Sequence, residues 1–301
     1  MAKGLITDIQ RFSLNDGPGI RSTIFLKGCN MHCTWCHNPE TISSKNNLLF
    51  YSAKCIGCGK CFEVCPQLVH ELRGGKHLIH RDKCIGCGKC AEECYAEALV
   101  MAGKVVDTDE VIKEVVQDKL YYTNSKGGVT ISGGEVLMQM DFAKDICDRL
   151  HKEGIDVAIE SNMSLPFDEI KELIDKVDLV MMDVKLFDDE MHKKYTGVSN
   201  KYVLENLKEL NKISKPVIVR TPLIPGVTDS IENLTNIAKL LEGMDNVICY
   251  ELLNFNPLGD TKYKGLDKDN DFEGNKPFAN SYLEEIKEGL KDINVQIKIG
   301  G

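Results

Sequence analysis

Most cysteines of this 301-residue chain fall into three short groups whose spacing suits iron–sulfur chemistry. The first group has the spacing C-x3-C-x2-C and consists of Cys29, Cys33 and Cys36. The other two share the spacing C-x2-C-x2-C-x3-C and consist of Cys55, Cys58, Cys61 and Cys65, then Cys84, Cys87, Cys90 and Cys94. Thiolates that lie two or three residues apart can wrap around one cubane, whereas scattered cysteines cannot. The sequence therefore predicts that all of these cysteines are metal ligands.

The second and third groups form an internal repeat with a period of about 29 residues, because KCIGCGKC begins at both Lys54 and Lys83. This run is the bacterial ferredoxin pattern, in which the fourth cysteine ligates the other cluster. The spacing predicts two [4Fe-4S] clusters with crossed ligands, namely Cys55, Cys58, Cys61 and Cys94, and Cys84, Cys87, Cys90 and Cys65. Zinc is the alternative, but zinc sites have no use for eight crossed cysteines. Disulfides are disfavoured because we expect no signal peptide.

The first group differs because three thiolates leave one iron of a cubane without a protein ligand. An open coordination position is where a small molecule can bind, by the logic that separates open catalytic zinc sites from closed structural ones. The amino and carboxylate groups of a substrate could fill it. The alternative is a closed structural site with His32 or His37 as the fourth ligand.

The C-x3-C-x2-C motif, with Trp35 before its last cysteine, resembles the radical S-adenosylmethionine (SAM) superfamily. The flanking segments are FSLNDGPGIRST at 12–23, FLKGC at 25–29 and WCHNPE at 35–40. Together they resemble the glycyl radical enzyme activating enzymes, and the layout is similar to the subgroup that carries a two-cluster ferredoxin-like insert. The resemblance covers nearly the whole chain and is specific, because several separated motifs agree in order.

The resemblance implies a reaction. A reduced cluster held by Cys29, Cys33 and Cys36 gives one electron to the sulfonium of SAM, and the resulting 5′-deoxyadenosyl radical removes a Cα hydrogen from a glycine of a partner glycyl radical enzyme. It also implies a catalytic role for Lys185, and Asp16 becomes the candidate for holding the partner's glycine loop. Taken without the resemblance, Asp16 to Gly19 is simply a turn.

The resemblance further implies a set of SAM-binding residues, namely Trp35, Gly133, Gly134, Glu135, Glu160, Met181, Asp183, Lys185, Arg220, Pro222 and Asn256. The two glycines let the backbone approach the methionyl ammonium, although Val136 stands where many members have proline. A monovalent cation is possible near the SAM carboxylate, at Glu160, Met181 and Asp183. Asn256 replaces a histidine of some relatives and cannot titrate.

The role of the insert stays open at this point. Its two clusters could relay electrons to the radical cluster from a flavodoxin or ferredoxin, dock the partner, or be structural. Relay is the prediction. Activating enzymes of this kind are usually monomers that engage their partner transiently, so a monomer is expected.

Composition limits the class of protein. A net charge of −9 without a basic stripe argues against nucleic acid as the main partner. No run reaches the roughly 18 apolar residues that a membrane span needs. Thirteen cysteines point to an anaerobic or strongly reducing cytoplasmic setting. Cys147 and Cys249 stand outside the groups and are expected to be buried small hydrophobes.

Hydrophobic patterning positions these residues. Strands are expected at about 24–26, 129–132, 156–160, 179–184, 216–220, 247–252 and 295–299. Helices are expected from about 107 or 108 through Leu120, at 140–153, 166–176, 230–243 and 278–291, and in the stretch up to about 213. Residues 254–277 are expected to be a polar loop.

Strand–helix alternation favours parallel strands with right-handed crossovers. About six units predict an α/β fold of the partial (β/α)6 barrel type, which is also the fold that the resemblance implies. The expected domains are a barrel at 1–47 and 104–301 and a ferredoxin-like insert at 48–103. Since the candidate polar residues each follow or end a different strand, we expect them at one rim, where parallel barrels bind ligands.

Two other functions compete with the activating enzyme. A radical SAM enzyme that acts on a small molecule would need an open auxiliary cluster, but both auxiliary runs have four cysteines. A multi-cluster electron-transfer protein would cleave no SAM, and the three-cysteine group and the glycine pair argue against it.

Overall fold

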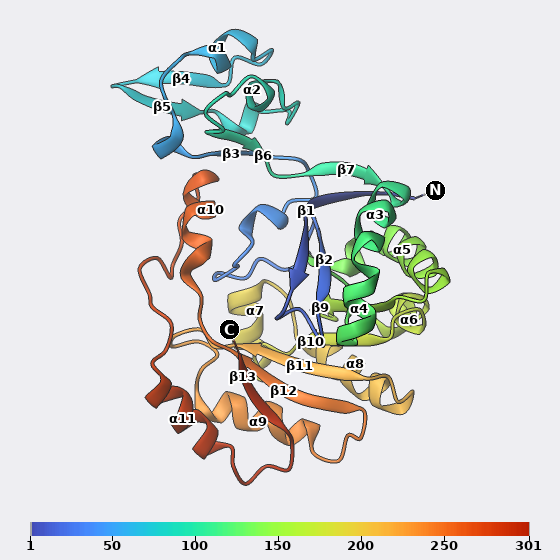
Figure 1. The fold of residues 1–301 in the computed structure, drawn as a ribbon. Coiled ribbons are helices and arrows are strands. Elements are labelled where there is room, and N and C mark those ends of the chain that lie inside the picture. The colour runs from blue at the N-terminus through green and yellow to red at the C-terminus, as the bar shows by residue number, and fades with distance from the viewer. Residues whose placement is uncertain (1, 301) are drawn as a thin grey trace.

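The computed structural model describes residues 2–300, and its centre is one large, mostly parallel sheet. Within these residues the sheet has nine strands, in the order β13 (Ile297–Gly300), β12 (Val247–Leu253), β11 (Val217–Pro222), β10 (Leu179–Asp183), β9 (Asp156–Ser161), β8 (Gly128–Gly133), β2 (Arg21–Leu26), β1 (Lys3–Ser13) and β7 (Lys104–Asp107). Neighbouring strands from β2 to β13 pair in parallel. The sheet curves into an open barrel whose edge strands are β7 and β13 (Figure 1).

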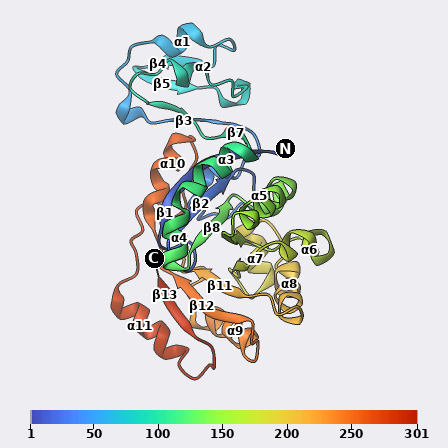
Figure 2. The same ribbon diagram turned by 45° about the vertical axis from the view of Figure 1, so that its right-hand side comes forward.

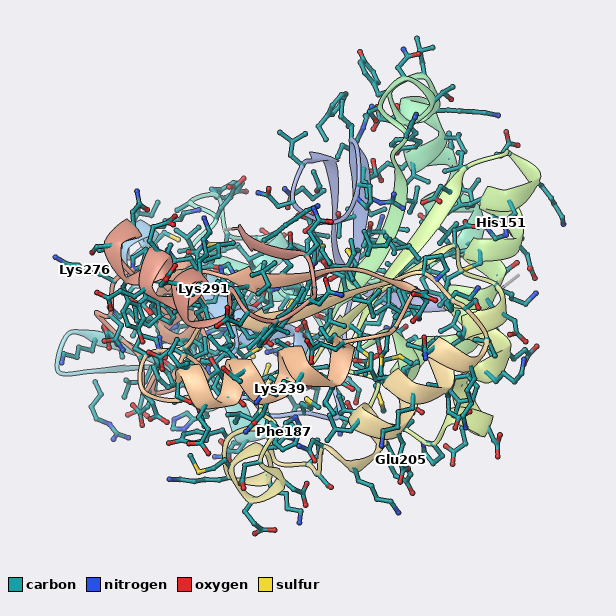
Figure 3. The ribbon with its side chains drawn as sticks, turned by 90° about the horizontal axis from the view of Figure 1, so that it is seen from below. His151, Phe187, Glu205, Lys239, Lys276 and Lys291 are labelled. Atoms are coloured by element: carbon teal, nitrogen blue, oxygen red, sulfur yellow. The ribbon has the colours of Figure 1, made fainter. Side chains whose placement is uncertain are left out.

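Helices cover the outer face of the sheet (Figures 1 and 2). They are α3 (Thr108–Val115), α4 (Lys119–Ser125), α5 (Met140–Lys152), α6 (Phe167–Asp175), α8 (Lys201–Lys212), α9 (Ile231–Leu241) and α11 (Asn280–Gly289). Their apolar stripes pack on the β-branched residues of the strands to form the main core. Seen from below, the polar side chains of His151, Glu205 and Lys239 lie on the outside of these helices, and Lys291 lies just beyond the end of α11 (Figure 3).

The strand–helix alternation fails at the start of the chain. Strand β1 pairs antiparallel with β2 on one side and with β7 on the other, and neither β1 nor β7 was expected. Strand β1 has no continuous apolar run, because exposed polar residues alternate along it. Its pairing with β2 also has two irregularities in register.

The helix expected from about 107 through Leu120 is interrupted. Helix α3 begins at a capping box formed by Asp107 and Glu110, and a 3-10 turn, η4 (Val116–Asp118), separates it from α4. The side chain of Arg11 binds both carboxylate oxygens of Asp118, and this contact stabilises the 3-10 turn between the two helices. As a result Leu120, expected on the buried face, is 69% exposed.

The expected loop at 254–277 contains two short elements, η6 (Pro257–Gly259) and α10 (Asp260–Gly265). Lys262 of α10 pairs with Glu40 at 2.7 Å, beside the short turn η1 (Pro39–Thr41) that follows the first cysteine group. Helix α7 (Asp189–Thr196) lies on the other side of that cysteine group, because His32 N donates to Thr196 O at 2.8 Å.

Residues 48–101 form a separate lobe beyond the edge of the large sheet (Figure 1). The lobe contains η2 (Ser52–Lys54), α1 (Lys60–Val64), η3 (Arg81–Lys83), α2 (Lys89–Glu92) and two small sheets, β3 (Leu48–Phe50) with β6 (Leu99–Met101) and β4 (His70–Arg73) with β5 (Lys76–Ile79). Each half of the repeat supplies one strand to each small sheet and one short helix. Of the helices described, none is both long and apolar enough to cross a membrane.

Candidate functional site

The barrel interior is built in two layers. The lower layer is apolar and consists of Ala158, Leu179, Met181, Ile218 and Cys249. Toward the strand ends it is followed by a charged layer of Asp183, Arg220 and Glu251, which Glu160, opposite Met181 in the register, joins through its ion pair with Arg220. The parallel register pairs Asp183 with Arg220 and Arg220 with Glu251, so neighbouring strands bring these groups to one level. Cys249 lies in the lower layer and Cys147 in the main core, which confirms both as buried residues.

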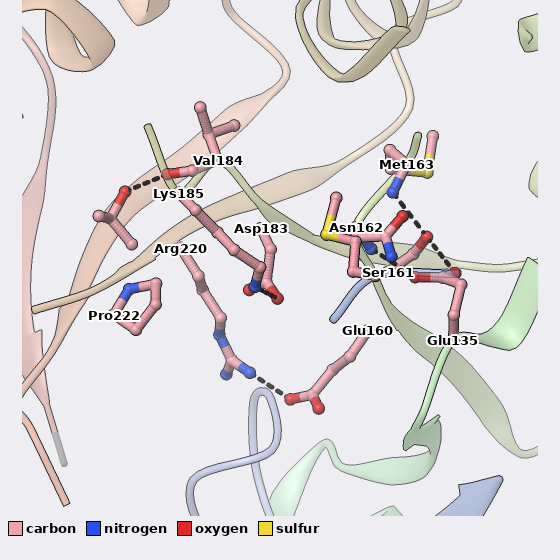
Figure 4. Close-up of polar contacts among 12 residues, drawn as sticks. Glu135, Glu160, Ser161, Asn162, Met163, Asp183, Val184, Lys185, Arg220 and Pro222 are labelled. Atoms are coloured by element: carbon pink, nitrogen blue, oxygen red, sulfur yellow. Dashed lines mark hydrogen bonds and ion pairs between the residues drawn. The ribbon is translucent and has the colours of Figure 1, made fainter. Parts of the chain in front are cut away.

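Arg220 is the centre of the charged layer. Its guanidinium binds Glu160 (Figure 4), and it also donates to Glu251 Oε2 at 2.6 Å and to the backbone oxygen of Asn15 at 2.9 Å. Burial lowers the pKa of Arg220, but the carboxylates of Glu160 and Glu251 outweigh burial and the net shift is upward. The arginine therefore stays charged and neutralises two carboxylates inside the barrel.

Lys185 and Asp183 form a second ion pair beside the first. Lys185 Nζ donates to Asp183 Oδ2 at 2.6 Å. Burial opposes the charge of Lys185, yet Asp183 and the nearby thiols of Cys33 and Cys29 raise its pKa overall. Lys185 is thus a fixed positive charge next to the first cysteine group. Glu160 and Asp183, where the resemblance implied a cation, already have protein cations as partners.

The loop between β1 and β2 enters the barrel. Asp16 Oδ2 accepts a hydrogen bond from Thr23 Oγ1 at 2.6 Å, and Asp16 O accepts one from Thr130 Oγ1 at 2.7 Å. Together with the contact between Arg220 and Asn15, these bonds hold Asp16 at the level of the charged layer. The segment that contains Asp16 is a turn, but one that is fastened to three strands of the sheet.

Gly133 and Gly134 make the turn after β8. Gly133 has a φ of +106°, and a Cβ at Gly134 would lie 2.3 Å from the backbone oxygen of Gly28. Glu135 N donates to the same Gly28 O at 2.8 Å, so the turn packs directly on the backbone that leads to the cysteines. The glycines are therefore required by this close approach, in addition to any ligand contact.

Glu135 was expected to bind the cofactor. In the structure its buried carboxylate connects the turn after β8 to the end of β9 through hydrogen bonds. It is 2% exposed, and its carboxylate accepts hydrogen bonds from Leu137 N, Ser161 Oγ and Asn162 N (Figure 4). Burial raises its pKa to about 7, against the opposing effect of these donors. Glu135 thus fixes the end of β9 relative to the glycine turn.

The first cysteine group follows β2 at the barrel mouth. Burial raises the pKa of the Cys29 and Cys36 thiols to about 12, so thiolates there need a compensating positive charge such as iron supplies. Tetrahedral zinc holds its sulfurs about 3.8 Å apart, given Zn–S bonds of about 2.3 Å. Among described residues, the one His, Cys, Asp or Glu group with all ligand atoms within 4.8 Å is Cys61, His70 and His77. No three cysteines of one group are therefore gathered as tightly, among the described residues, as the ligands of a tetrahedral zinc ion.

A cavity beside the first cysteine group brings Trp35 and Asn256 together. Its lining also includes Cys36, Phe255 and Tyr263. Asn256 Oδ1 caps η6 by accepting from Leu258 N at 3.0 Å. Pro222 is outside this lining and lies at the end of β11, beyond Arg220 (Figure 4).

Two residues of this region were missed from the sequence. Tyr263 was missed because α10 is too short for a periodic signal. Glu251 was missed although it ends a predicted strand, as Glu160 and Asp183 do, and that position was the available signal.

The lobe brings its cysteines together in two crossed sets. Cys65, Cys84, Cys87 and Cys90 line one cavity. Burial, together with the smaller effect of the nearby thiols of Cys55, Cys58 and Cys94, raises the pKa of the Cys61 thiol to about 11. The fourth cysteine of each run therefore lies with the first three cysteines of the other run.

Comparison with known proteins agrees with this geometry. The model of the radical SAM superfamily matches residues 23–238. The chain is 39% identical over 306 residues to the benzylsuccinate synthase activating enzyme of Thauera aromatica, covering 99% of this chain and 92% of that protein. It is 38% identical to the (2S)-3-sulfopropanediol dehydratase activating enzyme of Klebsiella oxytoca, covering 87% and 85% of the two chains. It is 37% identical to the trans-4-hydroxy-L-proline dehydratase activating enzyme of Clostridioides difficile, covering 99% of both.

The fold also resembles a radical SAM methyltransferase from Sphaerobacter thermophilus, with a TM-score of 0.54, 13% identity, and coverage of 98% of this chain and 76% of that one. An open parallel barrel with three cysteines at its mouth defines a radical SAM enzyme, and the chain belongs to that superfamily. Such enzymes use a [4Fe-4S] cluster and SAM. Within the superfamily the protein is a glycyl radical enzyme activating enzyme, which cleaves SAM reductively and abstracts a glycine hydrogen from its partner.

Proposed function

We propose that the barrel mouth binds SAM between the first cysteine group and the charged layer, and that the partner's glycine loop enters beside Asp16. The observation that carries this proposal is the convergence of Lys185, Arg220 and Asp16 in one interior next to Cys33. A cluster held by Cys29, Cys33 and Cys36 supplies the electron and an open iron. The rest of the work belongs to side chains of the barrel.

Each group in the charged layer has a task that suits its position. Lys185 and Arg220 supply positive charge to the carboxylate and ribose region of SAM, while Glu160 and Asp183 hold those cations in place. Trp35 and Asn256 line the cavity that suits the adenine, and Pro222, at the end of β11 outside that lining, would complete the site. The glycine turn presents backbone to the methionyl ammonium, with Glu135 holding the turn and Met181 forming the apolar floor.

Asp16→Asn is expected to reduce glycyl radical formation on the partner by about 10- to 100-fold, the worth of a hydrogen bond to a charged group. Cleavage of SAM without the partner should change by less than about threefold, because asparagine still accepts from Thr23 and keeps the loop in place. Both are measured anaerobically, by EPR of the partner and by quantifying 5′-deoxyadenosine.

The matched control is Asp8→Asn, an exposed aspartate on the preceding strand, which should leave both activities unchanged. Equal losses of cleavage and of glycyl radical would assign Asp16 to the SAM site instead. An unchanged radical yield would remove Asp16 from the reaction.

We further propose that 48–103 is a ferredoxin-like insert with two [4Fe-4S] clusters, which places the protein in the insert-bearing subgroup with three clusters in all. The crossed cysteine sets and the two matching halves of the lobe support this proposal. The clusters relay electrons from a flavodoxin or ferredoxin to the radical cluster. The protein works in the cytoplasm as a monomer that meets its partner transiently.

Paired cysteine substitutions test the crossed ligand sets. The reconstituted protein should hold about 12 irons, and Cys55→Ala with Cys94→Ala should leave about 8, because both ligands belong to one cluster. Cys55→Ala with Cys65→Ala should leave about 4, because each change removes a different cluster. Iron analysis and EPR of the reduced proteins measure both. The reverse order of iron losses would show that each run holds its own cluster.

A further inference from the structure

The two halves of the lobe share one backbone pattern, so their differences can be compared position by position. Strands β4 and β5 pair His70 with Ile79 and Leu72 with His77. Adding the 29-residue period to the β4 residues gives their equivalents in β6, and subtracting it from the β5 residues gives their equivalents in β3. The observed pairs there are Leu99 with Phe50 and Met101 with Leu48, in the same antiparallel register. His70 and His77 thus correspond to Leu99 and Leu48.

The two pairs also occupy equivalent places beside the cysteines. Leu48 and Leu99 are 2% and 3% exposed and pack in one cluster with Cys90. Cys61 is the equivalent of Cys90 in the first half, and a ring nitrogen of each of His70 and His77 lies within 4.8 Å of its sulfur. One auxiliary cluster is therefore bordered by two leucines and the other by two imidazoles.

The two histidines form a hydrogen-bonded pair, in which His70 is buried and His77 is half-buried. His70 Nδ1 and His77 Nε2 are 2.9 Å apart, and the rings of Phe50 and Phe62 pack around them. His70 is 7% exposed, and its second nitrogen, Nε2, is buried without a hydrogen-bond partner.

The hydrogen bond between the two rings determines which ring nitrogen can donate to a neighbouring group. If His77 Nε2–H donates to His70 Nδ1, the buried His70 Nε2 carries a hydrogen and is a free donor. Cluster sulfurs and thiolates only accept hydrogen bonds, so they can satisfy that donor. The opposite arrangement would leave His70 Nε2 as a buried acceptor without a donor, at a cost of about 1–3 kcal/mol.

We propose that the His70–His77 pair donates an N–H hydrogen bond to the sulfur of the cluster held by Cys55, Cys58, Cys61 and Cys94, and so raises its reduction potential above that of its twin. The inference rests on the proposed two-cluster insert. Reduction adds one negative charge to a cluster, and hydrogen bonds to its sulfurs stabilise that charge. The leucines at the other cluster offer no donor.

The two clusters also differ in their position relative to the barrel. The loop of the leucine-bordered cluster faces it, because Gly86 lies against the backbone oxygen of Asn46. Arg81, just before Cys84, donates to Gly265 O and Asp267 Oδ2, both at 2.7 Å, at the end of α10. With both clusters in place, an electron from a one-electron donor would rest on the histidine-bordered cluster and would reach the radical site through its twin.

Potentiometric EPR titration of the reconstituted protein tests this inference, with iron content measured first. The wild type should show two auxiliary couples, with imidazole ¹⁴N coupling in pulsed EPR of the one that is reduced first. In the double variant His70→Leu with His77→Leu, that couple should move to lower potential, toward its twin, and lose the coupling. Retained iron with an unchanged potential would overturn the inference.

Two further variants cover the case in which the leucine variant does not assemble its clusters. His70→Asn with His77→Gln keeps amide donors and should hold the higher potential. Leu48→His with Leu99→His should raise the potential of the twin cluster, and no rise would overturn the inference. A wild type with about 4 irons would instead refute the two-cluster insert itself.

Discussion

Cys33→Ala is expected to reduce SAM cleavage by at least about 1,000-fold, to background. The cluster would keep two of its three protein ligands and would no longer present a single open iron to the substrate. Cys33 is also one of the two thiols near Lys185, so its loss removes a neighbour of the charged layer. The measurement is 5′-deoxyadenosine formation from dithionite-reduced protein.

Iron analysis separates this effect from general misfolding. Cys33→Ala should retain about 8 of about 12 irons, since the proposed insert clusters keep all their ligands. The control is Cys147→Ala, a buried cysteine of α5 outside the three groups, which should keep full cleavage at a cost of about 1 kcal/mol of stability. Substantial cleavage by Cys33→Ala would place the radical cluster elsewhere.

Arg220→Met is expected to destabilise the protein by about 3–5 kcal/mol, the usual cost of removing one partner from a buried ion pair. The change leaves Glu160 and Glu251 facing each other without a cation and releases the backbone of Asn15. Anaerobic urea unfolding of the reconstituted protein measures the loss. Lys239→Met, on the exposed face of α9, is the control and should change stability by less than about 0.5 kcal/mol.

The defect of Arg220→Met should depend on pH in a known direction. Burial already raises the pKa of Glu160, and Arg220 is the group that opposes this rise. Without Arg220 the folded-state pKa is higher still, so stability is greatest while Glu160 is protonated and falls as pH rises through that value. We therefore expect a larger difference from wild type at pH 8.5 than at pH 6. A difference that shrinks as pH rises would contradict this electrostatic account.

The parallel part of the fold was predictable because its signals are local. Strand β8 is a β-branched run that ends in two glycines, and α5 shows a full apolar stripe that ends before Gly154. Strand β1 was missed because its pairing with β2 and β7, and not its composition, makes it a strand. Helix α10 has six residues and forms through its contacts with Glu40 and the lobe.

In the candidate site too, features set by local spacing were predictable and features set by long-range contacts were not. Spacing alone was enough to group the cysteines, because ligands of one cluster must lie close in sequence or in a repeat. The partners of Glu135 and Arg220 lie up to 205 residues away along the chain and follow from sheet register, which the sequence does not display. The His70–His77 pair was overlooked because the repeat was aligned by its cysteines and not by its strands.

The way in which the lobe joins the barrel has a consequence for the history of such a chain. Ala102 N donates to Asn47 O at 2.8 Å, so the two ends of the lobe are bonded to each other where they leave the barrel. A segment whose ends already meet adds little closure entropy and leaves the register of β1, β2 and β7 untouched. We therefore expect that a barrel of this kind can gain, lose or exchange the lobe in evolution without changes to the residues at its mouth.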